Sequence, residues 1–305
     1  MRADRLALAL WLALAVPAGA APVGVAPAGV APAGAAPVGV APICPPDPGT
    51  PALVLPHLDA AIRARRPIRI VALGSSSTEG VMATDADDTY PAELQEMLRA
   101  ALPGRPVRVV NRGIGGQDAR REMARMHHDA IATRPQLVIW QVGANAALHR
   151  GDPVAFARLV AAGVRRLQRR GIDVVLMDNQ RSPRLIASGD DALFDGTLAA
   201  VARRTGARLF SRDRLMRGWA REGHPELGFI ATDWLHHNDL GYRCVARALG
   251  GAILRGLRPP PRTGPAQVAA PAVTALERPS WFTPPPRAPA APGRAAARAS
   301  DRGSR

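Results

Sequence analysis

The chain has 305 residues, with 40 arginines, no lysine and 25 acidic residues, and its formal net charge is +15. Such a charge suits anionic partners, but the chain has no nucleic-acid-binding motif and no interleaving of basic with aromatic residues, so we do not expect nucleic acid as a partner. After residue 20 no apolar run reaches the roughly 20 residues that a membrane-spanning helix needs, which excludes a multi-span membrane protein.

The two ends differ in composition from the middle. Residues 1–20 have the charged start, apolar stretch and small residues of a secretory signal peptide, so we expect a secreted or periplasmic protein. Residues 21–42 repeat a five-residue Ala-Pro unit, and residues 21–50 are interpreted as an Ala/Pro/Gly/Val-rich linker. Residues 258–305, rich in Pro, Ala and Arg, have too few large apolar side chains to fold, and we expect this tail to be disordered and to contact anionic envelope surfaces loosely. Residues 51–257 remain, a size that suits one α/β domain.

Patterns typical of strands and helices alternate through this domain. Five short apolar runs predict buried strands, at residues 68–73, 107–110, 136–142, 173–177 and 207–210. Helices are predicted to start near residues 90, 117, 153, 191 and 239, and those from 90 and 153 have apolar residues at helical spacing. Asp152 and Pro153 mark the third of these starts, as N-cap and first helical residue. The alternation predicts an α/β fold, a three-layer α/β/α sandwich with about five parallel strands in flavodoxin-like order and the first strand central.

Four polar segments lie where chemistry is expected in such a sheet. Residues 74–80, 111–116 and 143–145 each follow a predicted strand directly, and residues 233–236 precede the last helix. Loops that follow parallel strands open onto one edge of the sheet, so these segments are expected to meet there. A serine, backbone N–H donors, an Asn amide and an Asp/His pair are together the components of an acyl-transfer site.

Each segment alone has a plainer explanation, because Gly, Ser and Asn are common turn residues and a His near an acid is ordinary. His127 and His128 are adjacent on a predicted helix and point to different sides, so we expect a solvated face there rather than a metal site. We expect no metal and no other cofactor.

Taken in order, the four segments resemble the conserved blocks of the SGNH (GDSL-type) hydrolases. The Thr-x-Gly register of the first block identifies Ser76 as the nucleophile among three serines, and the later blocks place Gly116, Asn145, Asp233 and His236 at the family's functional positions. The resemblance implies that His236, oriented by Asp233, takes the proton of Ser76. It also implies an oxyanion hole made of the N–H groups of Ser76 and Gly116 and the amide of Asn145.

The resemblance covers residues 68–254, with three departures near the site. Ser75 stands where the family usually has Asp, Ala146 follows the conserved Asn where Asp is common, and His237 stands where Pro or Leu is frequent. None of these changes removes a catalytic atom. His237 has no required role, and we expect it to be exposed or to form a pocket wall.

The resulting hypothesis is an exported serine ester hydrolase that acts on short acyl, acetyl-like esters of carbohydrate or lipid, with a small-molecule or glycan ester as substrate. A non-catalytic envelope or glycan-binding protein on the same fold and an O-acyl transferase remain as alternatives. Cys44 and Cys244 are expected to form a disulfide in an oxidising compartment, the alternative being two separate thiols. Loops at residues 179–188 and 212–229 are expected to form pocket walls.

Overall fold

The computed structural model describes residues 43–257, so the expected signal peptide, residues 21–42 of the expected linker and the tail lie outside the described residues. A five-stranded parallel sheet of order β2-β1-β3-β4-β5 forms the middle layer. The strands are β1 Ile68–Gly74, β2 Val107–Gly113, β3 Leu137–Gln141, β4 Asp173–Met177 and β5 Arg208–Phe210. The flavodoxin-like order is confirmed, although β3 is the middle strand and β1 lies beside it.

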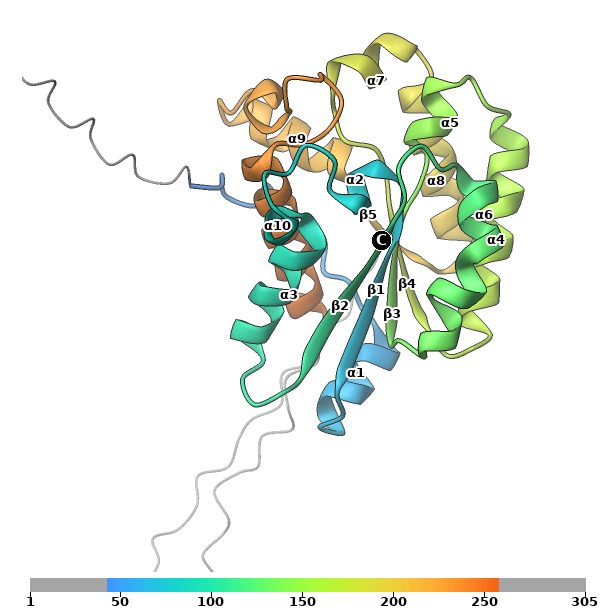
Figure 1. Ribbon diagram of the computed structural model, residues 1–305, viewed down its shortest axis with the longest axis vertical. Coiled ribbons are helices and arrows are strands. Elements are labelled where there is room, and N and C mark those ends of the chain that lie inside the picture. Colours follow the sequence, from blue (N-terminus) through green and yellow to red (C-terminus); the bar gives the residue numbers. More distant parts are fainter. Residues whose placement is uncertain (1–42, 258–305) are drawn as a thin grey trace, which may run out of the picture.

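Helices cover both faces of the sheet (Figure 1). Helices α3 and α10 pack on one face, and α4, α6 and α8 pack on the other. The helices are α1 Pro56–Arg63, α2 Ser76–Glu79, α3 Tyr90–Ala101, α4 Ala119–Asp129, α5 Ala144–Leu148, α6 Pro153–Gln168, α7 Pro183–Ser188, α8 Asp191–Thr205, α9 Arg212–Arg221 and α10 Asp239–Gly256. No helix within residues 43–257 is long and apolar enough to cross a bilayer.

The apolar run Ile70–Leu73 of β1 is explained by burial on both faces, whereas Arg69 near the start of the strand is exposed. Ile70 and Ala72 pack in the cluster that contains α3 and α10, whereas Val71 and Leu73 pack in the cluster that contains α4, α6 and α8. Alternate residues of a strand point to opposite faces, so a strand covered on both sides needs apolar residues at every position.

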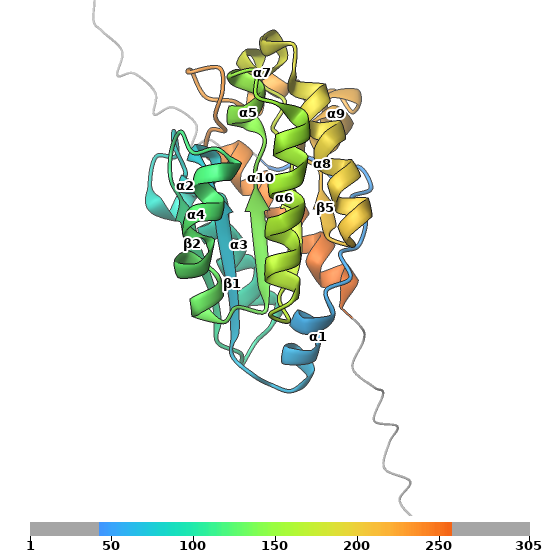
Figure 2. The same cartoon turned by 90° about the vertical axis from the view of Figure 1, so that its right-hand side faces the viewer.

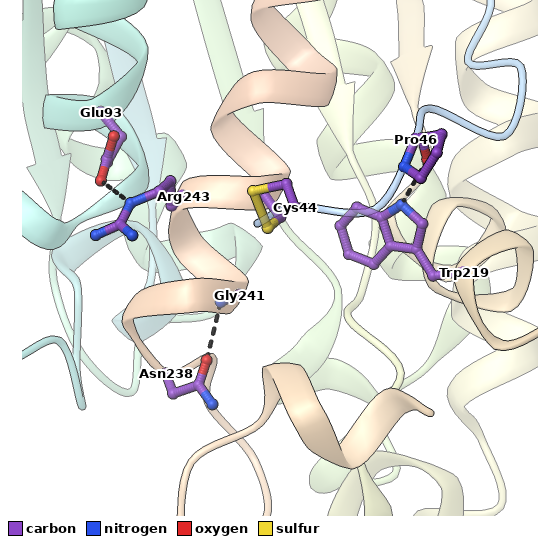
Figure 3. The surroundings of a disulfide bond; sticks show 8 residues. Cys44, Pro46, Glu93, Trp219, Asn238, Gly241 and Arg243 are labelled. Atoms are coloured by element: carbon purple, nitrogen blue, oxygen red, sulfur yellow. Dashed lines mark hydrogen bonds and ion pairs between the residues drawn. A yellow bond between two sulfur atoms is a disulfide. The ribbon is translucent and has the colours of Figure 1, made fainter. Parts of the chain in front are cut away.

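Local signals placed some helix starts well. The Asp152 side chain accepts a hydrogen bond from the backbone N–H of Val154 at 2.8 Å, with Pro153 at the first helical position, as predicted for α6. The Asn238 side chain caps α10 in the same way, by accepting from Gly241 N–H at 2.9 Å (Figure 3). Caps of this kind satisfy backbone donors that a helix start leaves unpaired.

The prediction of a loop over residues 212–229 is wrong for its first half. Helix α9 occupies Arg212–Arg221 and buries Leu215, Met216 and Trp219. Its many arginines lower its overall hydropathy, so the narrow apolar stripe did not stand out in the sequence.

An N-terminal strap, residues 43–50, packs on the domain although sequence analysis placed it in the linker. Cys44 forms a disulfide with Cys244 of α10, and the Trp219 indole N–H donates to the carbonyl of Pro46 at 3.2 Å (Figure 3). The folded unit therefore begins before residue 51.

Candidate active site

Ser76 lies at the carboxyl end of β1, as the first residue of the one-turn helix α2. Figures 1 and 2 show α2, α5 and α7 towards one end of the sheet and α1 at the other. Glycines let the backbone close tightly around the serine. A Cβ on Gly113, at the end of β2, would lie 1.9 Å from the backbone nitrogen of Glu79, and a Cβ on Gly74 would lie 2.3 Å from Thr78 Oγ1. Helix α2 can therefore sit directly on the ends of β1 and β2 because those positions lack side chains.

The structure brings Ser76, His236 and Asp233 into one hydrogen-bonded chain. The Ser76 Oγ lies 2.7 Å from His236 Nε2, and His236 Nδ1 lies 2.5 Å from Asp233 Oδ2. The other carboxylate oxygen of Asp233 accepts the backbone N–H groups of Leu235 and His236, each at 3.0 Å. Trp234, which follows Asp233, has a left-handed φ of 63°, and this bends the segment back on itself.

Burial raises the pKa of Asp233, but hydrogen bonds from the side chain of His236 and from the N–H groups of His236 and Leu235 outweigh it and hold the pKa below its ordinary value. The carboxylate therefore stays ionised at neutral pH. It fixes the proton of His236 on Nδ1 and leaves Nε2 free to accept the hydroxyl proton of Ser76.

The loop after β2 carries backbone N–H groups close to this serine. A Cβ on Gly115 would lie 3.9 Å from Ser76 Cβ. The next residue, Gly116, has a left-handed φ of 70° and open space around its Cα. Asn145, in the first turn of α5, donates one amide hydrogen to the carbonyl of Gln117 at 2.8 Å, which keeps its second amide hydrogen available. Ser76 N–H, at the start of α2, has no acceptor within its helix.

Residues 43–259 match the profile of the Non-GDSL lipase-like family. The chain belongs to this family. No curated protein matches the sequence significantly.

The fold is shared with solved esterases of low sequence identity. An acetyl xylan esterase, AlAXEase, is 22% identical over 61% of this chain and 100% of its own, with a TM-score of 0.53. A two-domain esterase (CEX) active on acetylated mannans is 22% identical over 70% of this chain and 56% of its own, with a TM-score of 0.57. Axe2, an acetylxylan esterase from Geobacillus stearothermophilus, is 19% identical over 63% of this chain and 95% of its own, with a TM-score of 0.52. Family and fold together are those of the SGNH-type esterases and lipolytic proteins.

In this Non-GDSL lipase-like protein, uncharged side chains hold residues 74–80, the segment that contains Ser76. Ser75 stands there in place of the Asp that is usual in SGNH hydrolases. Gln141, the last residue of β3, accepts three hydrogen bonds on its side-chain oxygen. They come from Ser75 N–H at 3.1 Å, from Ser75 Oγ at 3.3 Å and from Thr78 Oγ1 at 3.1 Å. All three residues are almost fully buried. The backbone on either side of Ser76 is thus held without a carboxylate.

Two further side chains, which sequence analysis did not single out, join the segments of the site. Arg125 of α4 donates to the carbonyls of Gly74 at 2.9 Å and Arg112 at 2.8 Å, and to the side-chain oxygen of Gln117 at 2.6 Å. The backbone just before Ser76 and the segment Arg112–Gln117 are therefore tied to one guanidinium group.

The second is Gln180, which is buried. Its amide donates to the carbonyl of Leu235 at 2.8 Å, and its side-chain oxygen accepts from Ser77 Oγ at 3.3 Å. It connects the serine helix to the turn that carries the acid and the histidine.

The expectation for His237 is wrong. This side chain is fully buried, and its Nδ1 donates to the carbonyl of Phe229 at 3.0 Å. Burial, reinforced by the nearby guanidinium of Arg212, lowers the pKa of His237 to about 3, so the ring stays neutral. His237 braces the turn from within and takes no part in a pocket wall.

Among residues 43–257 the carboxylates of Asp191, Asp195 and Asp213 are close enough to one another to share a cation. Burial and neighbouring carboxylates raise the pKa of Asp195 to about 9, so it keeps its proton at neutral pH. The side chains of Arg181 and Arg217 form ion pairs with Asp213. A proton and two guanidinium groups thus balance this cluster, and we do not assign it a metal.

Proposed function

We propose that this protein is a serine ester hydrolase that works through an acyl-enzyme. The observation that carries the proposal is the hydrogen-bonded chain from Asp233 through His236 to Ser76. In the first step His236 removes the hydroxyl proton as Ser76 Oγ attacks the ester carbonyl carbon, and it then gives that proton to the departing alcohol. His236 next takes a proton from a water molecule as that water attacks the acyl carbonyl, and it returns the proton to Ser76 Oγ as the bond to the acyl group breaks and the acid leaves.

The negative charge of each tetrahedral intermediate falls on the former carbonyl oxygen. Three donors support the proposal that it is stabilised, namely the N–H groups of Ser76 and Gly116 and the free amide hydrogen of Asn145. One such donor contributes about 3–4 kcal/mol to the transition state. Because Gln117 and α2 hold these donors in place before substrate binds, little reorganisation is needed when charge develops.

For the substrate we propose a short acyl ester, of the acetyl type, on a carbohydrate. Support comes from the structural neighbours described as acting on acetyl xylan and acetylated mannans. Two exposed apolar side chains flank the site, Trp234 beside the catalytic acid and Ile114 before the oxyanion loop. An indole face suits the apolar face of a sugar ring. The same pair would also suit the acyl chain of a lipid ester, which is the second candidate.

We further propose that the protein is exported to an oxidising compartment. The disulfide between Cys44 and Cys244 supports this, because disulfides persist outside the reducing cytosol. The signal-peptide pattern of residues 1–20 points the same way. Fractionation of cells that express the full chain tests it, and a protein that stays in the cytosol with free thiols contradicts it.

The decisive experiment for the enzyme proposal combines fluorophosphonate labelling with hydrolysis of p-nitrophenyl acetate. We expect the wild-type protein to be labelled and active, and Ser76→Ala to be neither. Ser77→Ala is the matched control, because it removes the neighbouring hydroxyl, and it should still be labelled. A wild-type protein that is neither labelled nor active would favour the glycan-binding alternative. Faster turnover with an added sugar alcohol than with water would favour the acyl transferase.

Ester series then identify the substrate. Acetylated oligosaccharides should be hydrolysed faster than p-nitrophenyl esters of long fatty acids. The opposite ranking would favour the lipid ester. Trp234→Ala should raise KM for acetylated oligosaccharides more than for p-nitrophenyl acetate, which has no sugar ring to stack.

A further inference from the structure

Positive charge gathers at the end of the sheet opposite Ser76, where the strands begin. We call this end the amino edge and define it by residues 64–67, 102–106, 130–136 and 169–172, the connections that lead into β1, β2, β3 and β4. These connections hold no Asp or Glu, and they contain Arg65, Arg66, Arg105, Arg134, Arg169 and Arg170. Two acids on neighbouring helices, Asp59 and Glu96, form ion pairs with arginines of their own helices. Asp129 and Asp173 border the connections, but Asp129 pairs with Arg125 and Asp173 is buried, so the six arginines leave the amino edge with a net positive charge.

Two adjoining hollows lie along the amino edge. The first, of about 600 Å³, is lined by basic side chains from three connections and two helices, Arg66, Arg134, Arg170, His57 and His127. The second, of about 820 Å³, is lined by five arginines that include Arg105 and Arg108. Arg134 and Gln136 line both hollows, so the two hollows adjoin, and we call them together the groove.

The arginines of the groove fall into two groups. Arg69, Arg99 and Arg105 donate to the carbonyls of Thr133, Val107 and Ile62, so they build the walls. By contrast, the guanidinium groups of Arg66, Arg108, Arg134 and Arg170 make no hydrogen bond or ion pair with any residue from 43 to 257. These four groups keep all their donors for a ligand.

The backbone at the groove is strained. Arg65 and Arg134 have left-handed φ values of 54° and 51°. This conformation costs a residue other than glycine about 1–2 kcal/mol. Arg134 lies where the two hollows meet, so the strained position presents a guanidinium group to both of them. Arg134 is also the C-terminal cap of the 3-10 turn Ile131–Thr133, so this turn fixes the position of its backbone between the hollows.

We propose that the groove binds an acidic polysaccharide, one that carries carboxylates on its sugar rings. The planar fork of arginine matches a carboxylate, and the amide of Gln136 and the rings of His57 and His127 suit sugar hydroxyls. No Phe, Tyr or Trp side chain lines either hollow for the stacking that single-stranded nucleic acids require. The exposed indole of Trp234, which could enter a bilayer, lies at the other end of the sheet.

The location assigns the groove a tethering role. The seven residues of β1 separate the amino edge from the catalytic serine by about 20 Å. A chain segment held in the groove is therefore out of reach of Ser76, and the groove keeps the protein on its polymer while neighbouring esters meet the catalytic edge. The binding itself does not depend on the proposed ester chemistry.

The test measures binding of the full-length protein to polygalacturonate at several salt concentrations. The variant Arg66→Gln/Arg134→Gly/Arg170→Gln should bind at least tenfold more weakly. The matched control is Arg158→Gln/Arg203→Gln/Arg247→Gln, which removes the same charge from exposed, unpaired positions outside the groove and should bind within twofold of the wild type. Hydrolysis of p-nitrophenyl acetate and the melting temperature should be unchanged in both.

Arg134→Gly alone is a safeguard against misfolding, because glycine relieves the left-handed strain and should not lower stability. It should still weaken binding several-fold. Equal weakening by the two triple variants would overturn the proposal, since it would reduce the effect to net charge. Wild-type affinity in the groove variant would overturn it as well. Groove-dependent binding that is tighter for phosphatidylglycerol vesicles or single-stranded DNA than for polygalacturonate would contradict the assignment of the ligand. If p-nitrophenyl acetate is not hydrolysed but binding behaves as expected, only the proposed enzyme function fails.

Discussion

Replacing Arg125 by Met tests whether its hydrogen bonds keep the segments of the site in position. Methionine keeps the length and apolar stem of the side chain but removes every donor. The carbonyls of Gly74 and Arg112 and the side chain of Gln117 would each lose a charge-assisted hydrogen bond. Gly74 lies two residues before Ser76, and the carbonyl of Gln117 holds the amide of Asn145, so nucleophile and oxyanion donors would lose their common anchor.

The size of the effect follows from these contacts. A hydrogen bond from a charged group contributes about 1.5–3 kcal/mol, and the side chain of Arg125 is only 14% exposed, so water replaces the lost bonds poorly. Bonds that share one side chain are not additive, so we expect a loss of about 2–4 kcal/mol in unfolding free energy. A misplacement of about 1 Å between reacting groups costs roughly 100-fold in rate. We therefore expect kcat for p-nitrophenyl acetate to fall about 30- to 100-fold with little change in KM.

Arg99 provides the matched control. It also donates to a β2 carbonyl, that of Val107 at 3.1 Å, and forms an ion pair on its own helix with Glu96, but it lies at the opposite end of the strand. Arg99→Met should lose about 1 kcal/mol of stability and keep kcat within twofold. The reasoning is refuted if Arg125→Met, assayed well below its melting temperature, keeps kcat within threefold of the wild type. It is also refuted if Arg99→Met loses as much activity.

Three more predictions concern other parts of the molecule. Asn145→Asp places a negative charge where the oxyanion forms and should lower kcat at least 100-fold, whereas a fall of less than fivefold would remove Asn145 from the proposed oxyanion hole. The pKa of Asp195 is raised from 3.8 to about 9 in the folded protein. The folded state therefore holds an extra proton between these values, and stability falls as the pH rises through this window. Asp195→Asn should accordingly raise the melting temperature more at pH 8.5 than at pH 5, and equal gains would contradict the shift. Cys44→Ser/Cys244→Ser opens a link between residues 200 apart and should lower the melting temperature by about 10 °C, and a fall below 3 °C would show that the link constrains little.

Sequence patterns predicted correctly those parts of the fold that depend on residues close together in the chain. The apolar run of β1 and the Asp152-Pro153 start of α6 are local signals, and both elements appear where they were predicted. The order of the four polar segments placed Ser76 and His236 at one edge because parallel strands share a direction. Topology and motif spacing were enough for these features.

Contacts between residues far apart in the chain could not be predicted from the sequence. Gln141 meets Ser75 across 66 positions, and Gln180 meets Ser77 across 103 positions, and no local pattern marks a glutamine as a partner of a serine. His237 was misjudged for the same reason. Its burial depends on the packing of η3, Glu226–Phe229, and α10 around it, and neither element shows this from its own sequence.

The N-terminal strap has a consequence for the order in which the protein is built. Its contacts are with Trp219 of α9 and with Cys244 and Arg255 of α10, which are the last described elements of the chain. At 5–20 residues per second, the ribosome makes Cys44 roughly 10–40 s before its partner. The first described segment can therefore dock only after α10 has been synthesised. Docking of the strap is thus a late step in the folding of the domain.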